Sequence, residues 1–359
     1  MIIGINGNGF IGYHLWVYFT YKCIGIQAIR LNRDLMSDLE NLSKCDVVIH
    51  TAEKNRGDEV LLYDNNTRSA QDLITALSNA GIQPLLIYTS SIHENTDTVY
   101  GEYRRSNISN FKKWAKNDNF ISIRLPNIFG PFCKPNYNSF IATFCSNLIN
   151  GESSNTSDTS VKLLYVDNLC RQIYNVINRI QLVITYDDEV KVADVYNVLS
   201  SFKVEYLDKY NIPEIKTSLE YNLFNTFRSY IPNELRVFSP IVHSDDRGYL
   251  YELAVFKQHG QVFSSITKPK FIRGGHFHTK RIERFCIVDG CAKIKIKKVG
   301  FDEKYEYIIK GEDNKIIDMP LYYMHTIENI GDTNLICCFW MNDILKDQKT
   351  DDSYIERLM

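Results

Sequence analysis

Short apolar segments alternate with helical patterns through the first part of the chain, and this alternation constrains the fold more than any other feature. The segments "MIIGIN", "IQAIRL" (26–31), "DVVIHTA" (46–52) and "PLLIYTSS" (84–91) are typical of buried strands. Helical patterns separate them, at "YHLWVYFTYK" and "NTRSAQDLITALSNAG". Strands joined by helices form a parallel sheet with right-handed crossovers. The sequence therefore predicts a doubly wound α/β domain of the Rossmann type.

The pattern changes near residue 235. Short alternating strands follow, such as "YLYELAVFK", "GQVFSSITK" and "NLICCFWMN", and turn signals such as "DDRG", "VDG" and "IGDT" separate them. A chain of 359 residues is also longer than one compact core usually organises. We therefore expect two domains, at 1–235 and 236–359, and we expect the second to be an all-β sandwich or barrel.

Composition excludes several classes of function. The net charge is −2 and no basic run is present, which argues against a nucleic-acid partner. No segment approaches the roughly 18 apolar residues of a membrane span, and the first residues lack the pattern of a signal peptide. The nine cysteines are scattered and form no CxxC pair, which indicates reduced thiols. We expect a cytoplasmic protein that acts on a small molecule.

Gly7, Gly9 and Gly12 form a GxGxxG turn between the first strand and the first helix. In that context the glycines let backbone N–H groups approach a pyrophosphate at the helix N-terminus, although glycines in an ordinary turn remain an alternative. An acid about 20 residues further on would hold the ribose 2′-hydroxyl of NAD. Here Arg30 and Arg33 stand instead, and two guanidinium groups suit a 2′-phosphate. The sequence thus favours NADP(H), unless these arginines are ordinary surface residues.

The segment "YTSSIHENTDTVYGEYRR" follows the fourth strand and carries groups suited to proton transfer. Tyr100 and Arg104 are four residues apart, so on a helix they share a face. A phenol has a pKa near 10, and a fixed cation can tune it for acid–base work near neutrality. With Ser91, this arrangement resembles the extended short-chain dehydrogenase/reductase family, whose motif YGxSK reads "YGEYR" here.

This resemblance implies an NADPH-dependent reductase in which Tyr100, Ser91 and Arg104 are catalytic. It implies cofactor contacts from Gly7, Gly9, Phe10, Ile11, Gly12, Arg30, Arg33, Ala52, Tyr100 and Arg104. "IRLPNIFGPFCKPNYNSF" and "LLYVDNL" resemble the substrate side of the family's nucleotide-sugar enzymes, which implies substrate contacts from Ser91, Asn127 and Lys134. Two departures bear on activity: the glycine turn is one residue shorter than GxxGxxG, and Arg104 replaces a lysine.

"GGHFHTKRIERF" places His276 and His278 on one face of a strand, with Glu283 after them. Such a pair could be a metal site, an acid–base pair or polar residues on an edge strand. With His325 in "MPLYYMHTIEN", the set resembles the metal-binding motifs of the cupin family. Three imidazoles and one carboxylate suit Zn, Mn, Fe or Ni. A metal-free site with a histidine base is the alternative.

Two details of this motif carry expectations about the backbone. Glu283 has the opposite strand parity to the histidines, so a bend or bulge is expected between them. Tyr322 stands where cupins often have glycine. Nearby, "DDRGYLYE" resembles the cupin-fold epimerases of 4-keto-6-deoxy sugar nucleotides, which implies that Arg247 binds the diphosphate and that Glu252 lies beside it. Without that resemblance, both would be residues of a surface turn.

The two domains together resemble bifunctional capsular-polysaccharide enzymes that make UDP-2-acetamido-2,6-dideoxy-β-L-talose on the route to UDP-L-FucNAc. The resemblance implies a UDP-linked 4-keto-6-deoxy amino sugar as substrate, C3 epimerisation, C4 reduction by NADPH, zinc and a homodimer formed through the cupin domain. Metal-bound histidines cannot act as the C3 base, so Lys280, Tyr322 and Tyr323 are candidates. A cupin isomerase with an inactive reductase domain and a non-catalytic binding protein stay open, as does the configuration at C4.

Overall fold

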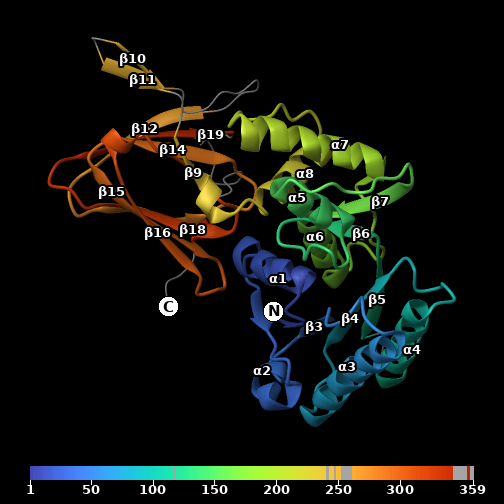
Figure 1. The fold of residues 1–359 in the computed structure, drawn as a ribbon. Coiled ribbons are helices and arrows are strands. Elements are labelled where there is room, and N and C mark those ends of the chain that lie inside the picture. Colours follow the sequence, from blue (N-terminus) through green and yellow to red (C-terminus); the bar gives the residue numbers. More distant parts are fainter. Residues whose placement is uncertain (116–118, 240–241, 246–247, 252–260, 343–353, 356–359) are drawn as a thin grey trace. The chain divides into compact units, whose positions relative to one another are not determined.

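The structure is a computed structural model that describes residues 1–115, 119–239, 242–245, 248–251, 261–342 and 354–355 (Figure 1). It divides into two compact units: an N-terminal unit of residues 1–147 and 153–196, and a C-terminal unit of residues 148–152 and 197–359. The division falls within helix α7 (Val192–Phe202). It therefore lies before the boundary expected at 235, and Tyr206 and Arg228 of the segment that follows α7 contact Asp318 of the C-terminal unit.

A parallel five-stranded sheet forms the centre of the N-terminal unit, as predicted, with the strand order β2-β1-β3-β4-β5. The strands are β1 (Ile2–Asn6), β2 (Gln27–Arg30), β3 (Val47–His50), β4 (Leu85–Ser91) and β5 (Phe120–Leu125). The order reverses beside β1, and open α/β sheets bind ligands at such a point, outside the carboxyl ends of the strands.

Helices cover both faces of this sheet. One apolar core joins β1 and β3 to α1 (Phe10–Val17) and α6 (Val166–Ile177), through side chains such as Ile5, Leu15 and Ile173. The other joins the opposite face to α2 (Leu39–Leu42), α3 (Glu59–Asn79) and α4 (Val99–Trp114), through Val48, Leu73 and others. Apolar side chains that alternate along buried strands supply both cores.

Side-chain caps define where the long helices begin. The carboxylate of Asp58 accepts from the backbone N–H groups of Val60 and Leu61 at the start of α3. Thr98 accepts from Gly101 at the start of α4. These caps satisfy N–H groups that have no partner within the helix. The cap on α4 matters for the site, because Tyr100 and Arg104 both lie on this helix.

The N-terminal unit also holds a small three-stranded sheet, in the order β6-β7-β8. Its strands are β6 (Asn127–Phe129), β7 (Ser160–Tyr165) and β8 (Asp188–Lys191), and α5 (Phe140–Asn150) lies between the first two in sequence. Within the described residues, no helix has the length and apolar character needed to cross a membrane.

The C-terminal unit contains two antiparallel five-stranded sheets, in the orders β12-β19-β14-β17-β9 and β16-β15-β18-β13-β20, and a hairpin β10-β11. The prediction of an all-β region is thereby confirmed, whereas its assignment as a cupin stays a prediction. The strands are β9 (Val237–Phe238), β10 (Val242–Asp245), β11 (Gly248–Tyr251), β12 (Gln261–Thr267), β13 (Ile272–Phe277), β14 (Glu283–Asp289), β15 (Cys291–Lys298), β16 (Lys304–Lys310), β17 (Ile316–Asp318), β18 (Tyr323–Asn329), β19 (Leu335–Met341) and β20 (Tyr354–Ile355).

A helical segment precedes these strands and belongs to the same unit. It consists of η3 (Lys203–Asp208), α8 (Ser218–Arg228) and η4 (Asn233–Arg236). Arg228 and Arg236 are almost completely buried in it. Both guanidinium groups approach the carboxylate of Asp318 in β17, at 3.9 Å and 3.6 Å respectively. These ion pairs join the helical segment to a β-strand of the same unit.

Candidate active site

The glycine turn after β1 forms the floor of a cavity. Gly7 has a φ of +132°, which glycine adopts at low cost. A Cβ atom on Gly12 would lie 1.8 Å from the carbonyl oxygen of Gly7, so only glycine allows α1 to approach the strand this closely. A Cβ atom on Gly9, by contrast, would meet nothing within 4 Å. The turn is thus tightly packed on one side and open on the side where a dinucleotide would lie.

Two adjoining cavities share Gly9, Thr51 and Glu53 in their linings. The first has a volume of about 500 Å³ and extends over Asn32, Arg33 and Arg68. The second has a volume of about 550 Å³. Between them they are lined by most of the residues predicted for cofactor and substrate: Gly7, Gly9, Phe10, Ile11, Gly12, Arg33, Ala52, Ser91, Tyr100, Arg104, Asn127 and Lys134. The individual roles of these residues remain predictions.

Arg30 differs from this expectation. Its guanidinium carbon lies 4.3 Å from the centre of the Trp16 ring, and Arg30 is not among the residues that line either cavity. Stacking on an indole stabilises a guanidinium group without any ligand. Asp34 also points elsewhere, because its carboxylate caps the short helix η2 (Leu35–Asp38) by accepting from Met36. Of the two predicted arginines, only Arg33 therefore lines the first cavity.

Arg104 lies at the centre of a buried polar network on the second cavity. Its Nη2 donates to the hydroxyl of Tyr100 at 2.8 Å, and its Nη1 donates to the carbonyl oxygen of Thr89 at 3.1 Å. The same Nη2 lies 2.6 Å from a carboxylate oxygen of Glu53, and both side chains are only 5% exposed. Burial alone would lower the pKa of Arg104, but Glu53 and the neighbouring phenols raise it above its usual value. The guanidinium is a permanent positive charge beside the phenol oxygen.

Glu53 was not among the residues predicted from the sequence. Besides Arg104, its carboxylate accepts a hydrogen bond from the hydroxyl of Tyr88. Burial raises the pKa of Glu53 above that of an ordinary glutamate, while Arg104 and the Tyr88 hydrogen bond lower it. One signal in the sequence points to this residue. A charged side chain follows directly after the apolar strand "DVVIHTA", at the carboxyl edge where parallel sheets place their sites.

The residues predicted to contact substrate lie in two parts of the chain, and their roles stay predictions. Asn127 and Lys134 line the second cavity together with Ser91, and so do His93 and Tyr137, which the sequence did not single out. The Nδ2 atom of Asn127 donates to the carbonyl oxygen of Lys162 at 3.2 Å. The other two predicted substrate contacts, Arg247 and Glu252, lie outside the described residues.

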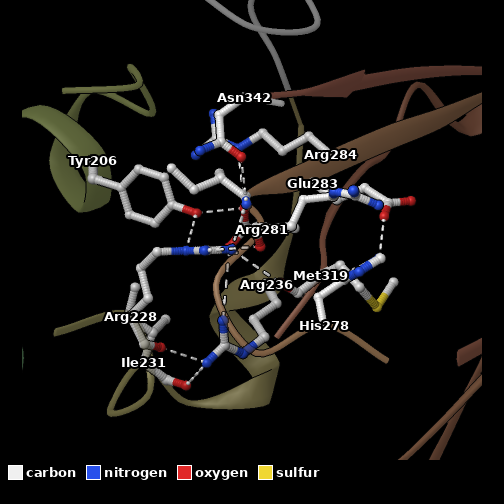
Figure 2. Close-up of polar contacts among 12 residues, drawn as sticks. Tyr206, Arg228, Ile231, Arg236, His278, Arg281, Glu283, Arg284, Met319 and Asn342 are labelled. Carbon is white, nitrogen blue, oxygen red and sulfur yellow. Dashed lines mark hydrogen bonds and ion pairs between the residues drawn. The ribbon is translucent and has the colours of Figure 1, made fainter. Parts of the chain in front are cut away.

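The C-terminal unit brings together the four predicted metal ligands. Donor atoms of His276, His278, Glu283 and His325 all lie within 4.8 Å of one another. Nε2 of His278 is 2.8 Å from a carboxylate oxygen of Glu283 (Figure 2). Three of the four side chains are buried, and His276 is half-buried. A cluster of three imidazoles and one carboxylate within this radius has the donor set of a divalent transition-metal site.

A β-bulge and a turn create this cluster. The register between β13 and β18 shifts between Gly274 and His276, so Gly275 is an extra residue and His276 pairs with His325. Both glycines have positive φ values, +92° and +79°. The chain then leaves β13 and turns before Glu283, which is the first residue of β14. The expected irregularity between the histidines and Glu283 is thus this turn, and the bulge precedes His276.

The protonation states of the cluster suit a metal ligand set. Although burial opposes it, the hydrogen bond with His278 and the charges of the other histidines lower the pKa of Glu283 to about 2. Burial lowers the pKa of His325 to about 3, against the opposing effect of Glu283. Near neutral pH the carboxylate is therefore ionised and this imidazole is neutral. The buried Nδ1 atom of His325 has no hydrogen-bond partner among the described residues.

The three candidates for the C3 base lie in different surroundings. The backbone N–H of Tyr322 donates to the carbonyl oxygen of His278 at 2.7 Å, and Tyr322 has a φ of +60°, a conformation in which glycine is unstrained. Burial, and then the charge of Glu303, raise the pKa of Tyr323, whereas Asn233 lowers it. Lys280 lies in the turn before Glu283. These positions do not rank the three residues.

Comparisons with known proteins agree with these observations. The model of the polysaccharide biosynthesis C-terminal domain matches residues 243–354. A UDP-2-acetamido-2,6-beta-L-arabino-hexul-4-ose reductase from Pseudomonas aeruginosa is 26% identical over 367 residues, covering 98% of this chain and 97% of that protein. The crystal structure of the capsular polysaccharide assembling protein CapF from Staphylococcus aureus covers 100% of both chains, with a TM-score of 0.58 and 29% identity.

The N-terminal unit has further structural relatives. The structure of RMD from Pseudomonas aeruginosa complexed with NADPH covers 64% of this chain and 98% of that chain, with a TM-score of 0.51. At 16% identity it shows a common fold alone. The family model described as the NAD dependent epimerase/dehydratase family matches residues 2–188, which is more than half of the 359 residues. With its parallel sheet, its glycine turn and its tyrosine at the second cavity, this chain belongs to the NAD dependent epimerase/dehydratase family.

Proposed function

We propose that this protein is a bifunctional nucleotide-sugar enzyme of surface polysaccharide synthesis. Its substrate is a UDP-2-acetamido-2,6-dideoxy-L-hexos-4-ulose, which it epimerises at C3 and then reduces at C4. The observation that carries the proposal is the Tyr100–Arg104 pair, which lines the cavity that begins at the glycine turn. The full-length similarity to a UDP-sugar ketone reductase and to a capsular polysaccharide protein supports it.

In the N-terminal unit, three side chains have separate roles in the proposed reduction of the ketone. NADPH, when bound, supplies the hydride. Tyr100 gives its phenolic proton to the oxygen at C4, Ser91 donates a hydrogen bond to that oxygen, and Arg104 stabilises the negative charge left on the phenol. Arginine keeps the charge of the family's lysine, and its forked guanidinium contacts Tyr100 and Glu53 together.

The preference for NADPH follows from the first cavity. Arg33 and Arg68 line it, and so can face a 2′-phosphate. Asp34 is the first acid in the loop after β2, and its carboxylate caps η2. A carboxylate is thus not offered to the 2′-hydroxyl from that position, which is the contact expected in NAD-specific sites.

In the C-terminal unit, we propose a cupin domain that catalyses the epimerisation. His276, His278, Glu283 and His325 would hold zinc or another divalent ion. Such an ion acts as a Lewis acid toward a substrate oxygen. The ketone at C4 makes the C3 hydrogen acidic, and a base removes the proton from one face and returns it to the other. Lys280, Tyr322 and Tyr323 are the candidate bases, with Arg247 and Glu252 as proposed substrate contacts.

We also propose a homodimer formed through this domain. β12 is the last strand of its sheet in the described part of the chain. Val262 and Ile266 on β12 are 59% and 58% exposed. Exposed apolar side chains on an edge strand favour association. Light scattering of the purified protein should give twice the mass of 41.7 kDa.

One experiment separates the proposed function from its alternatives. The enzyme is mixed in D₂O with the 4-keto sugar nucleotide and NADPH, the absorbance of NADPH is followed, and NMR identifies the product. Loss of NADPH together with deuterium at C3 is the expected result, and the NMR spectrum distinguishes talo from rhamno or quinovo products. Deuterium exchange without oxidation of NADPH would select a cupin isomerase with an inactive reductase domain. If neither reaction is observed, the remaining alternative is a non-catalytic binding protein.

A further inference from the structure

The turn that joins two of the predicted metal ligands is held from outside the β-sheets. Residues 279–282 lie between His278 and Glu283, and the carbonyl oxygens of Lys280 and Arg281 accept from side chains of α8. The hydroxyl of Tyr221 in α8 donates to the carbonyl oxygen of Lys280 at 2.8 Å. A helix of the segment before residue 235 thus contacts the turn on which the ligand positions depend.

Arg228, at the end of the same helix, contacts the turn and the neighbouring strand end (Figure 2). Its Nη2 donates to the carbonyl oxygen of Met319 at 3.0 Å, and its Nη1 lies 3.5 Å from the carbonyl oxygen of Arg281. Met319 is hydrogen-bonded to the predicted ligand Glu283, since the backbone N–H of Met319 donates to the carbonyl oxygen of Glu283 at 2.9 Å. One guanidinium group therefore contacts both the chain just before Glu283, at Arg281, and the residue that pairs with Glu283, at Met319.

Asn342 closes the remaining side of the turn. Its Oδ1 accepts from the backbone N–H of Ile282 at 2.9 Å, and its own N–H donates to the carbonyl oxygen of Ile282 at 3.2 Å. Its Nδ2 lies 3.4 Å from the hydroxyl of Tyr221. Three consecutive residues of the turn are thus bound by side chains of α8 or by the residue after β19.

A buried charge network holds Arg228 in place. The guanidinium is only 1% exposed and its Nε donates to the hydroxyl of Tyr206 at 3.1 Å. Tyr206 in turn donates to Asp318, which Arg284 and Arg236 also approach, at 3.2 Å and 3.6 Å. These charges lower the pKa of Asp318 despite its burial. A buried arginine with this many fixed partners has one geometry available to it.

From these contacts we infer that Tyr221 and Arg228 of α8 are positioning residues for the metal centre, which they act on through the 279–282 turn. The inference rests on the metal site included in the proposed function. Groups that fix the orientation of metal ligands contribute to affinity although they never touch the ion, and their loss typically costs tenfold to a hundredfold in metal affinity.

Cobalt binding to the full-length protein tests the inference without any turnover. The metal-free protein is titrated with Co²⁺ in competition with a chelator, and the visible ligand-field spectrum is recorded. Tyr221→Phe removes one half-buried hydroxyl, and Arg228→Lys keeps the charge but cannot reach both carbonyl groups. Each should weaken Co²⁺ binding by about tenfold or more and alter the spectrum. Tyr305→Phe is the matched control, because that hydroxyl donates to the exposed Glu303.

The outcomes separate the inference from the function on which it rests. If wild type binds Co²⁺ and both variants bind it with the same affinity and spectrum, the inference is wrong, even where their melting temperatures fall. Should Arg228→Lys fail to fold, Tyr221→Phe decides alone. If wild type itself binds no Co²⁺, the metal site and the positioning role both fail, while NADPH oxidation still reports on the reductase.

Discussion

Glu53 and Arg104 form an ion pair of 2.6 Å through the same nitrogen that donates to the hydroxyl of Tyr100 at 2.8 Å. A buried anion, a cation and a phenol are thus connected through one atom. The anion balances a charge that would otherwise be costly to bury. The arginine that replaces the family's lysine is therefore accompanied by an acid that keeps its guanidinium directed at the phenol.

Replacing Glu53 by glutamine should destabilise the N-terminal unit strongly. Because Arg104 would keep its charge without a carboxylate partner, we expect a loss of roughly 3–5 kcal/mol in the free energy of unfolding. Urea denaturation measures it. Glu94→Gln is the control, since Glu94 is equally buried but its partner Arg124 is 61% exposed and can turn to water. Equal losses for the two variants would contradict a special role for the Glu53–Arg104 pair.

Tyr100→Phe should stop reduction and spare epimerisation. Without the phenol no side chain at that position supplies the proton to C4 oxygen, so NADPH oxidation should fall by about 10²–10⁴-fold. Deuterium exchange at C3, the reaction proposed for the other unit, should continue at the wild-type rate. Tyr186→Phe serves as the control, because that hydroxyl lies 3.4 Å from the exposed Glu189 and Tyr186 lines neither cavity. A Tyr100→Phe enzyme that still reduces the ketone would exclude the proposed proton donor.

The two arginines after β2 should differ in their effect on coenzyme choice. Arg33→Ala removes a charge from the first cavity, so KM for NADPH should rise about tenfold or more while KM for NADH stays the same. Arg30→Ala should leave both values unchanged, because that guanidinium packs on Trp16. Steady-state kinetics with both coenzymes decide. A shift caused by Arg30→Ala and not by Arg33→Ala would reverse the assignment.

The histidine–glutamate cluster should bind about one divalent ion for each chain. His325→Asn and Glu283→Gln should each lower the bound metal sharply, as elemental analysis after dialysis would show, and a chelator should abolish C3 exchange in wild type. NADPH oxidation with a sugar that needs no epimerisation should persist in both variants. Full C3 exchange in chelator-treated protein would instead indicate the metal-free alternative with a histidine base.

His50 should make stability depend on pH. Burial, and secondarily the charge of Arg104, lower its pKa from 6.5 to about 3. The unfolded state then binds more protons between these values, so this contribution to stability is complete above pH 6.5 and is lost as the pH falls toward 3. Because a change of one in pKa corresponds to about 1.4 kcal/mol, the free energy of unfolding falls by at most about 5 kcal/mol through this group.

Urea denaturation across this pH range measures that contribution. His50→Gln should flatten the profile relative to wild type, whereas His93→Gln, at an exposed histidine, is the matched control. Identical profiles for wild type and His50→Gln would show that the buried imidazole does not couple to folding.

The features that were predictable from the sequence are those with a local cause. The strands of the parallel sheet follow from apolar runs, and the glycine turn follows from the spacing of Gly7, Gly9 and Gly12. Tyr100 and Arg104 meet because four residues make about one helical turn. The four residues of the histidine–glutamate cluster also converge as expected, since their motif carries information about a long-range arrangement.

The features that escaped prediction depend on tertiary contacts. Arg30 and Arg33 have the same residue type and nearly the same position, and only the placement of Trp16 separates them. Glu53 acquires its meaning from Arg104, which lies on another element. The segment around Arg228 is helical and polar in places and suggested no chemistry, because nothing local shows that its charges pair with Asp318. In each case the side chain is placed by a partner that is distant in sequence, and so the local sequence did not predict it.

The extra glycine in β13 has a consequence for how the proposed metal centre could be lost. Gly275 is the unpaired residue that lets His276 pair with His325 while Gly274 pairs with Thr326. In a regular ladder residue 275 would pair with His325 instead, and His276 would point to the opposite face, away from its three companions. A side chain at position 274 or 275, where φ is +92° and +79°, disfavours the bulge. One substitution outside the four predicted ligands would therefore disable the centre. In comparing descendants of this chain, the two glycines before His276 are as informative as the histidines themselves.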